Sequence, residues 1–256
     1  MSKAIWKINL TPMKTLLVLS SLFLLSDLGP CPAQVATNTA PPPAAPPVPA
    51  PRHILFQAPD DDSGGVLPSR IGGGSRGGGA DAPTVEVLVP EHVALTTEAR
   101  PLLFWYQTKG SKATVEISVM KPMNPEPIML CQTSSPTSAG VHYFRVAADL
   151  KPSVLYRWSV AVVLDPQNRS QDVVAYGVIK RIAPSPGLAA KLAQAPDQDK
   201  PTLYAQSGIW YDALESLSMQ IKRSPNDNDL QQERTDLLKQ VGLENAQFAA
   251  PPANSP

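Results

Sequence analysis

Apolar residues recur along the middle of the chain in short runs that are separated by turn residues. Seven runs are rich in Val, Ile, Tyr, Phe and Trp and bounded by Pro, Gly, Asn and Ser: 85–89, 102–107, 114–119, 128–131, 142–147, 156–163 and 172–179. Such runs are typical of β-strands. Their number and spacing predict an antiparallel β-sandwich over residues 83–183.

The stretch before the sixth run indicates which kind of sandwich to expect. Leu150, Pro152 and Tyr156 match the Leu-x-Pro-x-x-x-Tyr pattern that precedes a late strand of fibronectin type III domains. In that setting the tyrosine hydroxyl bonds to upstream backbone, forming a tyrosine corner. We therefore expect an immunoglobulin-like or fibronectin-type-III-like sandwich.

Helical periodicity replaces the strand pattern after residue 184. Apolar residues four positions apart form one face of a predicted helix over about 208–222: Ile209, Ala213, Leu217 and Ile221. A second stripe, at Leu230, Leu237, Leu238 and Val241, predicts a partner helix. The two helices predict a hairpin within residues 184–245 that resembles a tetratricopeptide unit. A single such unit cannot bury its apolar face alone, so we expect it to pack on the sandwich. The fold class is thus α+β, mainly β.

The first 33 residues have the pattern of an export signal. Lys3, Lys7 and Lys14 precede an apolar run at 16–25. This run is too short for a transmembrane helix, which needs ~20 residues. We expect cleavage after Ala33 and a periplasmic or secreted mature protein without a transmembrane helix. Acylation of Cys31, as in a lipoprotein, is the alternative.

Proline and glycine dominate the residues that follow. Residues 40–51 are almost entirely Pro, Ala and Val, which is too little apolar surface to offset the entropy of ordering. We therefore expect a disordered tether over 34–82 and a disordered tail over 246–256. Gly72, Gly74 and Gly77 have a G-x-G-x-x-G spacing, but Pro68 precedes them and Pro83 follows. Because that motif needs a strand before it and a helix after it, no dinucleotide site is predicted.

Charge and cysteine content narrow the function classes further. The 22 basic and 22 acidic residues give a net charge of zero, which argues against a nucleic-acid partner. Cleavage would leave Cys131 as the single cysteine, so no disulfide framework is expected. His53, His92 and His142 lack metal-ligand spacing. No metal or cofactor is predicted.

The candidate binding residues are two aromatic side chains in one predicted strand and three consecutive residues in one predicted helix: Trp105, Tyr106, Trp210, Tyr211 and Asp212. In a strand, Tyr106 points away from Trp105. The outward side of this strand either packs on the C-terminal helices, which we favour, or stacks on a sugar or peptide.

Asp212 raises the question of catalysis. It lies three positions before Glu215, on the same face of the predicted helix. A pair of carboxylates suits glycoside hydrolysis, but the helix also carries Lys222 and Arg223 and has ordinary amphipathic character. We favour a solvated helix surface and assign no catalytic residue.

Several sequence blocks together are similar to one known family. They are RIGGGSRG at 70–77, PLLFWY at 101–106, YRW at 156–158, GVIKR at 177–181, and YA with GIWYDAL within 204–214. In this order they resemble a mainly cyanobacterial envelope family known as domain of unknown function 928, over residues 70–243. A cysteine often follows the glycine run in that family, where this chain has Gly78 and Gly79. The family carries no assigned activity.

The leading hypothesis is a non-catalytic exported envelope protein that acts through protein contacts. One alternative is a carbohydrate- or peptidoglycan-binding module that uses Trp105 or Tyr106. Another is a hydrolase with an unrecognised site around Tyr211 and Asp212.

Overall fold

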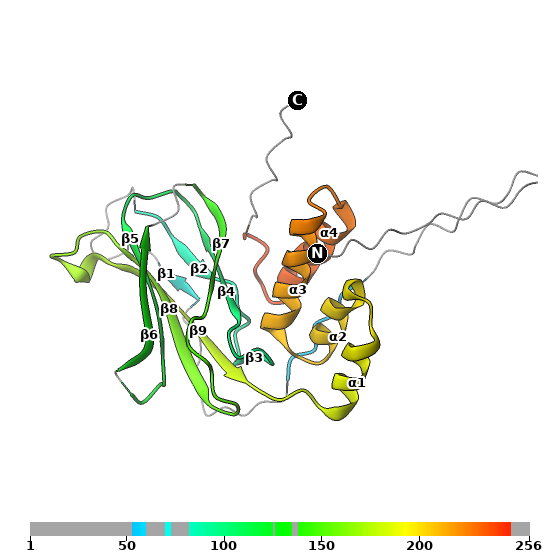
Figure 1. Cartoon of the computed structure of the whole chain (residues 1–256). Helices are drawn as coiled ribbons and strands as arrows, with labels where there is room; N and C mark the ends of the chain where they lie inside the picture. Colours follow the sequence, from blue (N-terminus) through cyan, green and yellow to red (C-terminus); the bar gives the residue numbers. More distant parts are fainter. Residues whose placement is uncertain (1–52, 60–69, 73–81, 125, 135–137, 247–256) are drawn as a thin grey trace, which may run out of the picture. The chain divides into compact units, whose positions relative to one another are not determined.

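The computed structural model describes residues 53–59, 70–72, 82–124, 126–134 and 138–246. The predicted export signal, the tail beyond residue 246 and most of the predicted tether lie outside these residues. The fold is mixed α and β, and mainly β (Figure 1).

In the described residues, nine strands form two sheets. The first sheet has the order β1-β2-β4-β7, with β1 Ile71–Gly72, β2 Val85–Val87, β4 Leu102–Gln107 and β7 Gly140–Arg145. The second has the order β3-β9-β8-β5-β6, with β3 Ala94–Thr96, β5 Thr114–Met120, β6 Pro127–Ser134, β8 Leu155–Val163 and β9 Val173–Arg181. Each of the seven predicted runs overlaps one of these strands, with ends that differ by up to three residues.

The second sheet is mixed, whereas the sequence predicted antiparallel strands throughout. β3 pairs with β9 in parallel, with Ala94 opposite Ile179. The sequence pattern did not predict β3. All three of its residues are buried, and a short, fully buried strand does not show the alternation of apolar and polar residues that marks a half-buried strand. Every other ladder is antiparallel.

Inward side chains from both sheets contribute to a large apolar core. Trp158 on β8 is fully buried and lies between Val119 on β5 and Gly177 on β9. A Cβ atom on Gly177 would lie 2.4 Å from the indole Nε1 of Trp158. Glycine is therefore required at position 177 because the backbone of β9 and the Trp158 ring approach so closely.

The predicted bond of the tyrosine corner is present. The backbone N–H of Lys151 donates a hydrogen bond of 3.1 Å to the Tyr156 hydroxyl, and Tyr156 is 1% exposed. This bond fixes the loop that leads into β8.

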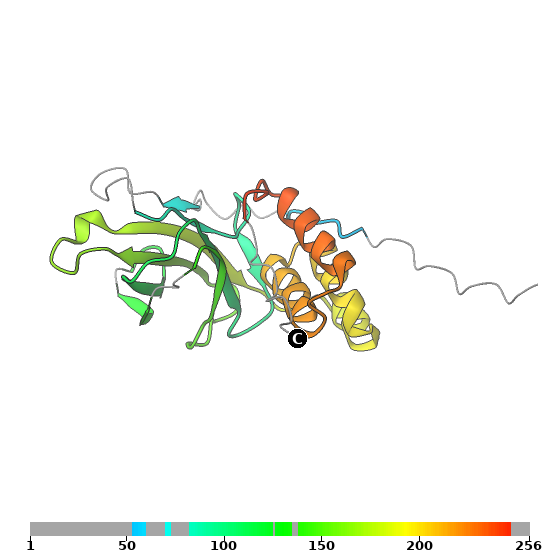
Figure 2. The same cartoon turned by 90° about the horizontal axis from the view of Figure 1, so that it is seen from above.

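Up to residue 246, four helices follow the last strand: α1 Pro186–Gln194, α2 Lys200–Gln206, α3 Trp210–Arg223 and α4 Asn228–Lys239. A short 3-10 turn, η2 Asp197–Asp199, precedes α2. The Asp227 side chain caps α4 by accepting bonds from the N–H groups of Asp229 and Leu230. Such a cap satisfies backbone donors that the helix itself leaves without a partner. α3 contacts α2, α4, β3 and β4 (Figures 1 and 2).

Part of the predicted tether packs on the helices. Ile54 is 5% exposed, and the backbone N–H of Gln57 bonds to the carbonyl of Ala205 at the end of α2. We call residues 53–59 the strap.

Candidate functional site

The first turn of α3 joins the helices to the sheets. Trp210, Tyr211 and Asp212 follow one another in this turn, and none is more than 4% exposed. Trp210 donates from its indole Nε1 to the carbonyl of Leu88, at 2.8 Å. Its ring also contacts Phe56 of the strap edge-on, with centroids 5.1 Å apart. Trp210 therefore connects α3, the segment after β2 and the strap.

Tyr211 reaches the core of the second sheet. Its hydroxyl accepts a bond of 2.7 Å from Nε1 of Trp158 and donates one of 3.2 Å to the carbonyl of Val178. Burial raises the pKa of Tyr211 well above its ordinary value. The hydroxyl thus remains protonated and supplies partners to two buried groups.

Asp212 is held by the loop that follows β3. Its Oδ1 accepts from the Thr96 hydroxyl at 2.5 Å, and its Oδ2 accepts from the N–H of Thr97 at 2.9 Å and also from the Thr97 hydroxyl. The expected solvated position is therefore wrong for Asp212, which is 4% exposed. The donors that stabilise this carboxylate lie more than a hundred positions away in the sequence. The residues next to Asp212 in the helix therefore gave no sign that it is buried.

Burial changes the pKa of the Asp212 carboxyl. It raises the pKa of this carboxyl from 3.8 to about 6; the bonds from Thr96 and Thr97 oppose this rise, and the charge of Glu98 adds to it. A buried carboxylate is costly unless it is hydrogen-bonded. Both of its oxygens are already engaged as acceptors, so Asp212 has the environment of a structural carboxylate.

A cleft of about 210 Å³ opens beside Asp212. Its lining comes from the loop after β3, η2, α2 and α3: Glu98, Asp197, Lys200, Tyr204, Asp212, Glu215, Ser216, Met219, Gln220 and Arg223. Glu215 is held in place because it accepts from the N–H of Leu102 and pairs with Arg145 on β7. Burial and the nearby charge of Asp212 raise the pKa of Tyr204.

A larger groove of about 470 Å³ adjoins this cleft. The two share Asp197, Gln220 and Arg223, so they form one depression across α3. The larger groove is lined by η2, α3 and the start of α4: Pro196, Asp197, Gln198, Gln220, Arg223, Ser224, Asp227, Asp229, Leu230 and Glu233. Asp197 pairs with Lys200 at 2.7 Å and with Arg223 at 3.4 Å. We call the combined depression the α3 groove.

The aromatic candidates on β4 lie apart from this groove. Trp105 is 3% exposed and contacts His142 at 5.8 Å between ring centroids. Its ring therefore offers no open face for stacking. Tyr106 is half-buried. On the side of β4 opposite to Trp105, Phe104 contacts the exposed ring of Tyr143 at 5.8 Å, and Lys222 of α3 reaches the Tyr143 hydroxyl at 3.5 Å.

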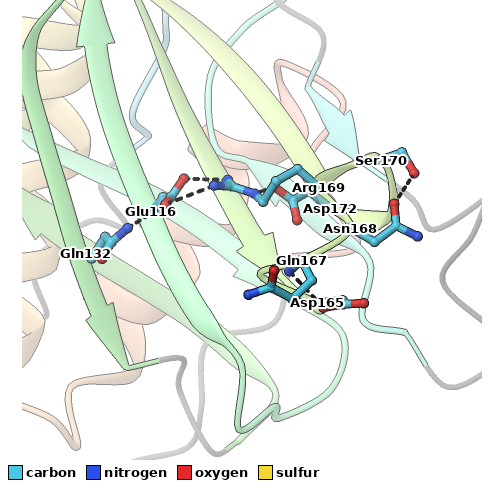
Figure 3. A network of polar contacts seen from close by, with 8 residues as sticks. All are labelled: Glu116, Gln132, Asp165, Gln167, Asn168, Arg169, Ser170 and Asp172. Atoms are coloured by element: carbon cyan, nitrogen blue, oxygen red, sulfur yellow. Dashed lines mark hydrogen bonds and ion pairs between the residues drawn. The ribbon is translucent and has the colours of Figure 1, made fainter.

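A second polar cluster lies at the β8–β9 hairpin (Figure 3). Arg169 bonds to both oxygens of Glu116 on β5 and pairs with Asp172 at 2.7 Å. Gln132 on β6 donates to Glu116 at 2.6 Å. The bond from Arg169 lowers the pKa of Glu116. One guanidinium placed between two carboxylates ties the hairpin to β5, and this cluster has the character of a structural bridge.

The described part of the chain was compared with the requirements of a metal site and of a membrane-spanning helix. Within it, no group of three or more His, Cys, Asp or Glu side chains is arranged to hold a metal ion. None of the helices in these residues is long and apolar enough to cross a membrane.

Titration of Asp212 is expected to make the protein less stable as the pH rises from about 4 to 6. Because the folded-state pKa lies above 3.8, the folded chain binds more protons than the unfolded chain in this window, and the free energy of unfolding falls as the pH rises. The shift corresponds to about 3 kcal/mol. Urea unfolding of the wild type and Asp212→Asn between pH 4 and 7 measures most of it: the wild type should lose about 2–2.5 kcal/mol more than the variant, since part of the effect falls below pH 4. Asp149→Asn, at an exposed site, should retain the wild-type slope, and equal slopes for the wild type and Asp212→Asn would contradict the prediction.

Comparison with known proteins relates the sheets and helices described above to one family. A family model described as Domain of Unknown Function (DUF928) matches residues 71–252, a range that includes each strand and helix of the described residues but not the strap. A comparison with curated proteins gave no match.

Proposed function

This chain belongs to the family described as Domain of Unknown Function (DUF928), and on that premise we propose that it is an exported, non-catalytic protein-interaction module of the cell envelope. The resemblance noted in the sequence is thereby confirmed. Because the family description names no activity, the proposal is argued from the residues of this chain alone.

The α3 groove is the observation that carries the proposal. It combines a depression of about 470 Å³ with a smaller one of about 210 Å³ along a single helix. The first turn of that helix is fixed to the sheets by Trp210, Tyr211 and Asp212. A depression on a rigid support needs little reorganisation when a partner binds, which favours affinity.

The charge of the groove indicates the chemistry of its partner. Asp197, Asp227, Asp229 and Glu233 line the larger part, and Arg223 is the basic residue among its described lining residues. Leu230 and Pro196 supply apolar surface between them. A protein segment that carries lysine or arginine beside an apolar side chain complements this lining, since interfaces match opposite potentials.

Export is supported by the sequence. The three lysines and the apolar run at 16–25 precede the described residues and have the order of a signal peptide. We propose a periplasmic or secreted mature protein, with acylation at Cys31 as the alternative. The balanced charge of the chain supports a partner other than nucleic acid.

We also propose that the two parts of the fold are related to known modules. The bond from Lys151 to Tyr156 and the division of the strands between two sheets support a fibronectin-type-III-like sandwich. The pairing of α3 with α4 supports a tetratricopeptide-like hairpin. The carbohydrate-binding alternative has less support, because Trp105 is buried. The hydrolase alternative has less support, because both oxygens of Asp212 accept bonds from threonines.

Site-specific photo-crosslinking in the native host tests the proposal. A photoreactive residue at Asp229 or Ser224, both exposed in the groove, should crosslink to the same protein. The control position Asp149, exposed outside the groove, should give no such product. Mapping should place the crosslink on a basic segment of the partner. The yield should fall at 1 M salt, where the Debye length is about 3 Å.

The same material tests export. The crosslinked chain should be recovered from the envelope fraction, and its intact mass should show that the leader has been removed. Equal products from the control position Asp149, or no product from either groove position, would overturn the proposed role of the groove. An uncut chain in the cytosol would overturn the proposed export.

A further inference from the structure

The strap is bound to the helices as an extended segment (Figure 2). The N–H of Gln57 donates to the carbonyl of Ala205 at 3.0 Å. Gly208, which has a φ of +72°, lies so close that a Cβ atom on it would be 2.8 Å from the carbonyl oxygen of Gln57. Position 208 therefore needs glycine both for its backbone conformation and for the passage of the strap.

The side chain of Gln240 binds the backbone of the strap. The Gln240 amide donates from Nε2 to the carbonyl of Ile54 at 2.9 Å and accepts at Oε1 from the N–H of Phe56 at 2.8 Å. The two bonds thus go to the backbone groups on either side of Leu55, as bonds from a neighbouring β-strand go to the outward-facing N–H and C=O groups of an extended segment. Recognition through backbone groups gives affinity for an extended segment whatever its sequence.

Alternate side chains of the strap supply the sequence-dependent contacts. Ile54 is 5% exposed, whereas Leu55 is 55% exposed. Phe56 is edge-on to Trp210 at 5.1 Å and stacked on His92 at 5.9 Å. The site thus accepts an aliphatic side chain and an aromatic side chain two positions apart, and leaves the residue between them in solvent.

We propose that the groove formed by Ala205, Gly208, Trp210 and Gln240, here the strap groove, is a binding site for an extended protein segment of the Ile-x-Phe kind, and that the strap is its resident competitor. The contacts of the strap indicate which side chains a ligand of this site would need. Residues 60–69 join it covalently to the sandwich, so it competes at an effective concentration in the millimolar range. A partner segment gains access when the strap opens.

This proposal is independent of the α3 groove. The strap groove uses Gln240, beyond the last turn of α4, whereas the α3 groove uses Asp227 and Asp229 at the start of that helix. Crosslinking at Asp229 and occupancy of the strap groove are therefore separate readouts, and one can fail while the other holds.

Amide hydrogen exchange of the unaltered full chain is the first test. A strap that opens locally should release the amides of Phe56 and Gln57 at least about 100-fold faster than the amide of Val160 in β8, because local opening costs less than global unfolding. If these amides exchange as slowly as that of Val160, the strap does not open on its own, and the proposal is overturned.

Peptide binding is the second test. The probe is a fluorescent peptide with the sequence of residues 53–59, followed by anisotropy. In the full chain, Ile54→Ala combined with Phe56→Ala should weaken the resident strap and make the peptide bind at least about tenfold more tightly than to the wild type, since the competitor is removed. Leu55→Ala, at the exposed position of the strap, is the matched control and should leave the affinity unchanged.

An isosteric change in the groove completes the test. Gln240→Glu retains the shape of the side chain but cannot donate to the carbonyl of Ile54. In the background of Ile54→Ala and Phe56→Ala, it should weaken peptide binding by about tenfold or more. Circular dichroism should show each variant to be folded. No binding to the folded double variant, or no effect of Gln240→Glu, would overturn the proposal.

Discussion

Replacing Trp210 by alanine is expected to lower the free energy of unfolding by about 3–5 kcal/mol, the range for removing a large aromatic side chain from a core. Trp210 is fully buried, and the change also leaves the carbonyl of Leu88 without its indole donor. The strap loses the ring against which Phe56 packs. Urea denaturation followed by far-UV circular dichroism measures the cost.

Tyr143→Ala provides the comparison for this prediction. Tyr143 is also aromatic and contacts Phe104, but its side chain is 48% exposed. Its removal should cost about 1 kcal/mol or less, as for most surface substitutions. If the two variants were equally stable, the first turn of α3 would not be the main connection between helices and sheets.

The second large effect is expected from Gly177→Ala. The added Cβ atom would lie 2.4 Å from Nε1 of Trp158, and the ring has little freedom to move because that nitrogen is bonded to Tyr211. Overpacking of cores typically costs 1–3 kcal/mol, and we expect about 3 kcal/mol here because the obstacle is a fully buried, hydrogen-bonded ring. Thermal and urea unfolding measure the loss.

Gly187→Ala is the matched control for this substitution. Gly187 lies in α1, and a Cβ atom there would meet nothing within 4 Å. Alanine is favoured over glycine in a helix by about 1 kcal/mol, so this variant should be as stable as the wild type or slightly more stable. A Gly177→Ala protein as stable as the Gly187→Ala protein would contradict the close approach of β9 and Trp158.

Local patterns were sufficient to predict the elements that are recognisable from their own residues. The apolar runs at 114–119 and 156–163 correspond to β5 and β8. The motif from Leu150 to Tyr156 predicted a specific hydrogen bond, since both partners lie within the motif. Helix α3 was likewise found because its apolar face repeats within one segment.

The features that the sequence did not reveal depend on distant partners. The strap lies within the stretch predicted to be a disordered tether, and Gln240, which holds it, lies 184 positions beyond Phe56. Asp212 is distinguished from a surface acid by Thr96 and Thr97, which precede it by more than a hundred positions. Neither relation leaves a periodic signal in a single chain, because periodicity reports only the face that a local element buries.

The bond between Tyr211 and Trp158 makes the strands and α3 depend on one another for stability. The indole nitrogen of Trp158, inside the β-sheet core, finds its acceptor on a helix that the chain reaches only after the last strand. A protein fragment containing the strands alone would leave that buried donor without an acceptor, which costs about 1–3 kcal/mol. The strands and α3 are therefore expected to unfold together, as one cooperative unit.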